Sequence, residues 1–80
     1  MNITQIRQFT TVARLESMSR AAQLLHVTQS ALSKSVSQLE RELGTALFDR
    51  SGKRLRLNAS GERFLECCEK NAPRARLGAG

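Results

Sequence analysis

The stretch SRAAQLLHVTQSALSKSVSQLERELG, residues 19–44, decides the fold of this chain. Its apolar residues fall into two segments of helical spacing, with a short interruption between them. Ser19 can accept a hydrogen bond from a first-turn amide of the first segment, and Thr28 offers the same cap to the second. The pattern predicts a short helix over about 19–25 and a longer one over Gln29–Leu43, joined by a turn. Two capped helices in this order indicate a helix-turn-helix pair.

The longer predicted helix is apolar on one side only. At 100° per residue its apolar residues lie within roughly 60° of one another: Leu32, Val36, Leu39 and Leu43. The opposite side has hydroxyl and basic side chains and no acid: Ser30, Ser33, Lys34, Ser37 and Arg41. Short hydroxyl groups let a helix approach the base edges of DNA, and Lys34 and Arg41 can reach base acceptors or phosphates. Gln29, at the helix start, adds an amide that can pair with adenine.

The segments around this pair complete the predicted core. A first helix is expected from about Thr4 to about Leu15, with one apolar stripe: Ile3, Ile6, Phe9 and Ala13. The short helix of the pair has a small apolar face: Ala21, Leu24 and Leu25. Gly44 can take the left-handed conformation that ends a helix, and the short segments 47–50 and 55–57 then predict a two-stranded hairpin, or wing. Such a hairpin is marginal alone, so we expect four apolar residues to rest on the helices: Leu47, Phe48, Leu55 and Leu57.

The last part of the chain predicts one further helix and a tail. Asn58 can cap a helix over about Ala59–Ala72, with apolar residues at helical spacing: Phe64, Leu65, Cys68 and Ala72. Pro73 stops it, and because 73–80 has no period and little to bury, we expect a disordered tail there. The predicted fold class is mainly α, a winged helix-turn-helix with a three-helix core, a two-stranded wing and the start of a further helix. Residues 1–58 would form the domain proper.

Charge and length narrow the function. The chain has 80 residues, enough for one domain and too few for a sizeable catalytic cleft. It has 13 Lys and Arg against 7 Asp and Glu, a net charge of +6, so it attracts polyanions such as nucleic acid or an anionic membrane. A basic helix face alone is usually only a solvated face. The wing adds weight, because residues 44–57 hold four basic residues and one acid, a net of +3, which suits phosphates or a minor groove.

Several classes of function find no support in the sequence. No apolar run approaches the ~18–20 residues that cross a bilayer, and the amino end has no signal-peptide pattern, so we expect a cytoplasmic protein with no membrane partner. Cys67 and Cys68 are adjacent, which excludes a disulfide framework and the spaced ligands of a zinc site. Since no nucleophile–base pair, phosphate-binding loop or metal cluster is visible, we expect no enzyme, cofactor or metal. Glu40 and Glu42 are expected to be solvated acids on a helix surface.

Three runs of the sequence point to a known family. AAQLLHVTQSALS at 21–33, LERELG at 39–44 and LFDR at 47–50 closely resemble the amino-terminal domain of LysR-type transcriptional regulators. The resemblance covers the chain from about Asn2 to about Glu69. It implies three helices, a wing and a linker helix over 59–72, with double-stranded operator DNA as the ligand. It also implies which residues meet DNA, in the major groove and on the wing respectively: Gln29, Ser30, Ser33 and Lys34, then Lys53 and Arg54.

Three departures from the family pattern matter. Ser30 stands where proline is very common, so the first turn of the reading helix loses a rigid residue and gains a hydroxyl. Lys34 stands where arginine is frequent, and a lysine lacks the planar fork that pairs with guanine, so base preference there is expected to be softer. Family members continue through a long dimerising helix into an effector domain, whereas this helix meets Pro73. We therefore expect a truncated head with no small-molecule effector, present as a monomer or a weak homodimer.

The sequence thus favours sequence-specific binding of double-stranded DNA in transcriptional regulation. The residues expected to contact DNA are Thr28, Gln29, Ser30, Ser33, Lys34, Ser37, Arg41, Arg50, Lys53 and Arg54. One alternative is a truncated partner that pairs with an intact paralogue and weakens its activity. Another is a non-functional remnant of a frameshift.

Overall fold

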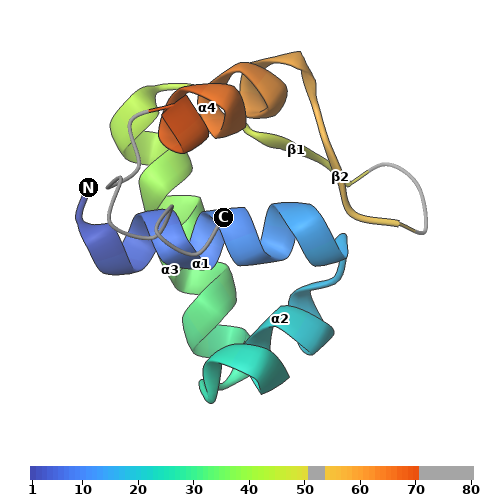
Figure 1. Cartoon of the computed structure of the whole chain (residues 1–80). Helices are drawn as coiled ribbons and strands as arrows, with labels where there is room; N and C mark the ends of the chain where they lie inside the picture. The colour runs from blue at the N-terminus through green and yellow to red at the C-terminus, as the bar shows by residue number, and fades with distance from the viewer. Residues whose placement is uncertain (51–53, 71–80) are drawn as a thin grey trace.

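The computed structural model describes residues 1–50 and 54–70. In this part the elements are α1 (Ile3–Leu15), α2 (Met18–Leu25), α3 (Gln29–Leu43), β1 (Phe48–Asp49), β2 (Arg56–Leu57) and α4 (Ala59–Lys70). Figure 1 shows α1 crossing α3, with α2 near the beginning of α3 and α4 near its end. The strands β1 and β2 pair antiparallel beside this helical body. The predicted winged helix-turn-helix is confirmed.

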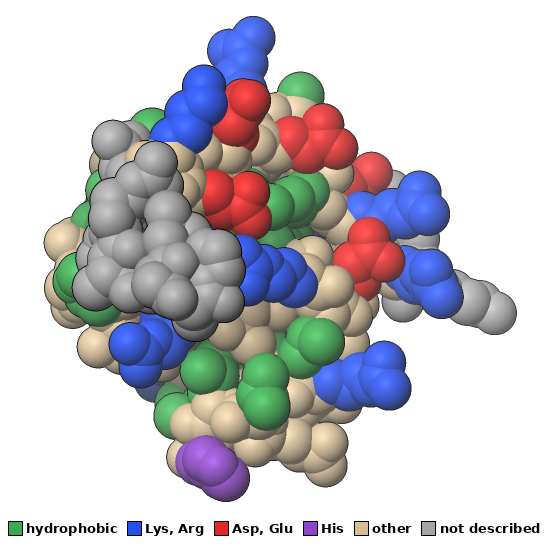
Figure 2. All heavy atoms as spheres, in the orientation of Figure 1, with side chains coloured by type: hydrophobic (Ala, Val, Ile, Leu, Met, Phe, Trp, Pro, Cys, Tyr) green, Lys and Arg blue, Asp and Glu red, His purple; other side chains and the backbone are tan. Residues whose placement is uncertain are grey.

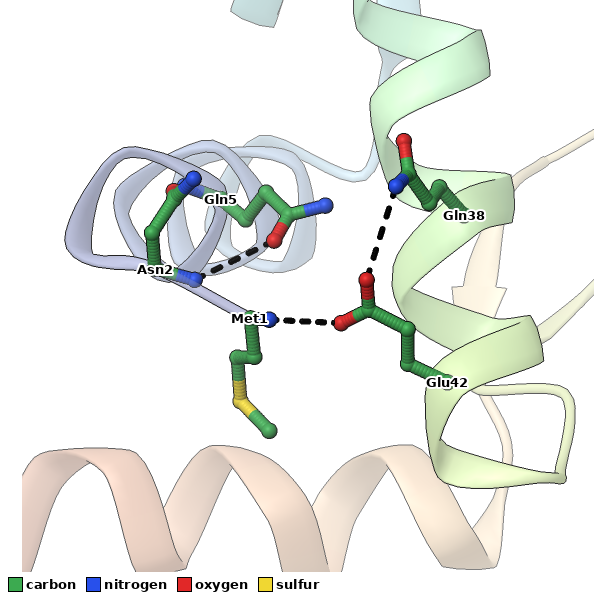
Figure 3. A network of polar contacts seen from close by, with 5 residues as sticks. All are labelled: Met1, Asn2, Gln5, Gln38 and Glu42. Carbon is green, nitrogen blue, oxygen red and sulfur yellow. Dashed lines mark hydrogen bonds and ion pairs between the residues drawn. The ribbon is translucent and has the colours of Figure 1, made fainter.

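The start of α1 is fixed by contacts that the sequence analysis did not predict. Asn2 and Gln5 form a capping box, because the Asn2 side chain accepts a hydrogen bond from the Gln5 amide at 2.8 Å and the Gln5 side chain accepts one from the Asn2 amide at 3.1 Å. Figure 3 shows the Met1 ammonium nitrogen beside Glu42 of α3, 2.7 Å from its Oε1. Gln38 also donates to Glu42, at 3.5 Å. The beginning of α1 is thereby tied to the end of α3.

The cap of the first helix of the helix-turn-helix lies two residues earlier than predicted. Ser17, and not Ser19, is the N-cap of α2, since its hydroxyl accepts a hydrogen bond from the Arg20 amide at 3.1 Å. The expected capping role is thus filled by a serine one half-turn earlier. His26 ends α2 in the left-handed conformation, at φ 59°. Thr28 caps α3 as predicted, accepting from the Ala31 amide at 3.0 Å.

The core lies where α1, α2 and α3 meet. Its largest fully buried side chains come from α1, α3 and the residue before β1: Phe9, Val12, Leu32, Val36, Leu39 and Leu47. The predicted buried side of α3 is therefore confirmed. Gly44 ends α3 with φ 74°, also as predicted.

The structure departs from the predicted apolar faces at three residues. Val12 is fully buried although the predicted stripe of α1 omitted it, because the stripe is centred on Phe9 and Val12. Ile3, the first residue of α1, is 66% exposed. Leu24 is 64% exposed. α2 packs through Ala21 and Ala22, and at 100° per residue Leu24 points roughly 110° away from their common direction.

The base of the wing rests on an aromatic cluster. Phe48 of β1 pairs in register with Leu57 of β2 and lies 5.6 Å from the ring of Phe9. Phe64 of α4 approaches the same Phe9 ring at 5.1 Å. The hairpin and α4 thus both pack on Phe9 of α1. This agrees with the prediction that apolar residues of the wing rest on the helices. Each strand has only two residues.

Asn58 and Gly61 fix the start of α4. The Asn58 side chain accepts a hydrogen bond from the Gly61 amide at 2.7 Å, which confirms the predicted cap, and it donates to the Ala46 carbonyl at 2.9 Å. Gly61 is buried, and a Cβ at this position would collide with the Leu47 carbonyl oxygen. The predicted end of this helix near Ala72 and the predicted tail lie outside the described residues. Within those residues no helix is long and apolar enough to cross a membrane.

The close contact at Gly61 gives a test of the fold. We expect Gly61→Ala to lower the free energy of unfolding by about 1–3 kcal/mol, as overpacking does when backbone must move. That corresponds to a fall in melting temperature of about 4–8 °C per kcal/mol for a domain of this size, measured by circular dichroism. Ser60→Ala is the matched control on the same turn. Equal melting of the two variants and the parent would show that α4 does not pack against Leu47.

Candidate nucleic-acid interface

The helix-turn-helix contains a long stretch without negative side chains. From Ser17 to Leu39, across α2, the turn and most of α3, the sequence has no Asp or Glu. In Figure 2 the acidic side chains lie in the upper part of the view, over α4 and towards the wing, and none is seen around α2 at the bottom. A surface without acids can approach a phosphate backbone with little electrostatic repulsion.

The polar face of α3 stands clear of the core. Burial of Leu32, Val36 and Leu39 turns the opposite side of the helix outward, so five predicted site residues share one face: Ser30, Ser33, Lys34, Ser37 and Arg41. Ser30, Lys34 and Arg41 are exposed, whereas Ser33 and Ser37 are half-buried. Gln29 is exposed at the first position of the helix. These side chains thus share one face of α3, where short serine side chains alternate with long polar and basic ones.

Thr28 has a structural role that limits its part in the interface. Its hydroxyl oxygen already accepts the hydrogen bond from the Ala31 amide. The residue is exposed, so its hydroxyl hydrogen and the second lone pair of its oxygen remain available to a ligand. Thr28 therefore supports the start of α3 first and can contribute the rest of its hydroxyl group to a ligand.

Arg50 and Arg54 of the wing both face carboxylates. We use the term wing for the described residues 47–50 and 54–57. Arg50 Nη2 lies 3.7 Å from Glu40 Oε1, and Arg54 Nη1 lies 3.9 Å from Glu16 Oε1. Both arginines are exposed. Lys53, the third predicted wing contact, lies outside the described residues.

The two acids at the end of α3 are not simply solvated, contrary to expectation. Glu40 is half-buried, with a side chain only 16% exposed. Its Oε2 accepts a hydrogen bond from the Leu47 amide at 2.7 Å. Glu42 is exposed, but the hydrogen bond from the Met1 ammonium group lowers the pKa of its carboxyl group. Pattern analysis of one helix could not foresee either contact, because both partners come from other segments.

Of the described basic residues that are exposed and were not among the predicted contacts, two belong to the helix-turn-helix or the wing. Arg20 is exposed on the first turn of α2, and Arg56 is exposed on β2. Arg20 lies inside the stretch from Ser17 to Leu39 that has no Asp or Glu. The absence of acids in this stretch is the sequence signal that could have marked Arg20 as a candidate contact. Arg56 was counted in the charge of the wing, and its exposure on the strand makes it available to a ligand.

The metal-ligand side chains and the cysteines of the described residues were also candidates for a site. They contain no group of three or more His, Cys, Asp and Glu side chains that could hold a metal. Cys67 is exposed and Cys68 is half-buried. Burial, together with the nearby Cys67 and Glu69, raises the pKa of the Cys68 thiol, which makes it less reactive than an ordinary cysteine.

Comparison with known proteins identifies the family of this chain. Residues 3–62 match the family described as bacterial regulatory helix-turn-helix proteins, lysR family. The uncharacterized HTH-type transcriptional regulator YybE of Bacillus subtilis is 45% identical over 65 residues, which cover 81% of this chain and 22% of that protein. HTH-type transcriptional regulator TrpI of Pseudomonas aeruginosa is 43% identical over 67 residues, covering 84% and 23%. This chain therefore spans less than a quarter of the length of these relatives.

Solved structures share the fold. The BenM_DBD complex with catB site 1 DNA superimposes with a TM-score of 0.84 at 30% identity, covering 88% of this chain and 78% of that one. Full-length CbnR in complex with its target DNA gives a TM-score of 0.85 at 33% identity, covering 99% and 27%.

The family match includes α1, the helix-turn-helix, the wing and the first turn of α4. Its description is that of a regulator, which agrees with the prediction of a regulatory protein and not an enzyme. This chain belongs to the lysR family of bacterial regulatory helix-turn-helix proteins, and it has the fold of a DNA-binding domain of that family.

Proposed function

We propose that this chain binds double-stranded DNA in a sequence-dependent manner, with α3 in the major groove and the wing along the flanking backbone or minor groove. The observation that carries the proposal is the outward face of α3, where serine and basic side chains stand together without an acid. The relatives with DNA in their solved complexes support it by fold. A transcriptional role would place the protein in the bacterial cytoplasm, where the chromosome lies.

The shape of the face fits a base-reading role. B-DNA has a major groove about 12 Å wide, which admits one α-helix. Ser30, Ser33 and Ser37 are short, so the helix axis can come close to the base edges there. Gln29 can offer its amide to adenine, and Lys34 can reach a guanine acceptor or a phosphate as a point charge. Direct base contacts would therefore come from the first half of α3.

The wing suits contacts with the backbone. Arg50, Arg54 and Arg56 are all exposed and lie on or beside the two strands. Phosphate contacts fix the position of a protein on the duplex without reading its sequence. The wing would thus supply affinity and register, while α3 supplies discrimination.

Salt dependence tests whether the surface binds phosphates. If α3 and the wing neutralise about 4–6 phosphates, the logarithm of the binding constant falls with the logarithm of salt concentration at a slope near −0.9 per phosphate. We expect Arg54→Ala to reduce the magnitude of that slope by about one, as measured by fluorescence anisotropy with a labelled random-sequence duplex. Arg63→Ala, an exposed arginine on α4, is the matched control and should keep the parent slope. A flat response of the parent would refute nucleic-acid binding.

Lys34 tests the base-reading side of α3. With a duplex selected by the parent protein from a randomised pool, we expect Lys34→Ala to weaken binding and to relax the preference at one base pair by about 1–3 kcal/mol. Gln38→Ala is the control on the same helix, because Gln38 turns towards Glu42 (Figure 3). Uniform weakening on every sequence would assign Lys34 to a phosphate. Unchanged binding on every sequence would remove it from the interface.

A further inference from the structure

Two of the three wing arginines, Arg50 and Arg54, form ion pairs with carboxylates of the protein itself. Arg50 follows β1 and pairs with Glu40 of α3 at 3.7 Å. Arg54 precedes β2 and pairs with Glu16, the residue that ends α1, at 3.9 Å. Figure 2 shows acidic and basic side chains next to one another where the wing leaves the helical body. Two separate acids, from two different helices, thus face the two guanidinium groups.

The two acids are held with different firmness. Glu40 is anchored, because its second oxygen accepts the 2.7 Å hydrogen bond from the Leu47 amide and its side chain is only 16% exposed. Glu16 has a side chain that is 45% exposed. When a phosphate approaches the wing, the Glu40 carboxylate therefore stays beside Arg50, whereas the Glu16 side chain can turn away from Arg54.

We infer that Glu16 and Glu40 are counter-charges that lower the affinity of the wing for DNA phosphates. The inference rests on the DNA-binding function proposed above. A phosphate that takes an arginine from its carboxylate replaces one ion pair by another, so the net gain is smaller than for an unpaired arginine. The anchored Glu40 carboxylate also remains within a few ångströms of the incoming phosphate and repels it.

This attenuation acts equally on every DNA sequence. Phosphate contacts are independent of sequence, and the two ion pairs hold arginines of the wing, not Gln29 or Lys34 of α3. Removing either acid should therefore tighten binding to selected and random duplexes by the same factor. Contacts between α3 and the bases would keep their full discrimination.

The test compares Glu16→Gln and Glu40→Gln with Glu66→Gln. Glutamine at position 40 keeps an oxygen that can accept the Leu47 hydrogen bond. Glu66 is exposed on α4, so its variant makes the same change in net charge elsewhere. We expect Glu16→Gln and Glu40→Gln to bind a random-sequence duplex about two- to fivefold more tightly than Glu66→Gln at low salt, the range expected for an exposed ion pair. The difference should shrink as salt rises.

A second background identifies the arginine responsible. In a chain that already has Arg50→Gln, Glu40→Gln should no longer bind DNA more tightly than Glu66→Gln. In a chain that already has Arg54→Gln, Glu16→Gln should likewise bind no more tightly than Glu66→Gln. Circular dichroism melts of all variants separate loss of folding from loss of binding. Glu16→Gln leaves the hydrogen bond between Leu47 and Glu40 intact, so it tests the inference even if Glu40→Gln unfolds.

The outcomes are distinct. If the parent binds duplex DNA with steep salt dependence while the three glutamine variants bind alike, the inference is wrong and the proposed function stands. An advantage that survives removal of the arginines, or that differs between selected and random duplexes, also overturns it. If the parent does not bind duplex DNA at all, the proposed function fails and the inference fails with it.

Discussion

Burial of one side of α3 is the constraint on which the rest of the structure depends. Leu32, Val36 and Leu39 are buried in the core that α3 shares with α1 and α2, where Phe9 and Val12 are themselves fully buried. Because the helix is rigid, that packing fixes the direction of its other side. The serine and basic face must then point outward, at a fixed angle to the body. A core interaction therefore sets the orientation of the candidate DNA-reading surface.

The peptide of Leu47 connects this core to the wing and to α4. Its amide donates to Glu40 of α3, and its carbonyl accepts a hydrogen bond from the Asn58 amide at 3.0 Å. Gly61 lies against the same carbonyl, where no larger residue fits. Three elements thus meet at one buried residue. The position of the wing relative to α3 follows from these contacts, and so does the spacing between the two surfaces proposed to contact bases and backbone.

The sequence predicted most of the helical architecture because local signals agreed with tertiary packing. The apolar period of α3, its Thr28 cap and its Gly44 end are all found in the structure, and so is the Asn58 cap of α4. Prediction failed where a choice depended on neighbours. Two serines could cap α2, and the structure uses Ser17.

Contacts between distant segments could not be predicted from pattern. Leu24 looked like part of an apolar face, but the alanines of α2 set its packing direction. The residues of the candidate face on α3 followed from helical period alone. The carboxylate partners of the wing arginines did not, because Glu16 and Arg54 are far apart in sequence and meet only in the fold.

The most direct test of the account is to map the DNA-facing surface residue by residue. Backbone amide shifts of the 15N-labelled chain can be followed by nuclear magnetic resonance while an unlabelled duplex, selected by the chain from a random pool, is added. The account predicts that the largest shifts occur in the exposed face of α3 between Thr28 and Arg41, with a second group at Arg50 and Arg54. Shifts confined to α1 and α4, with α3 unchanged, would contradict it.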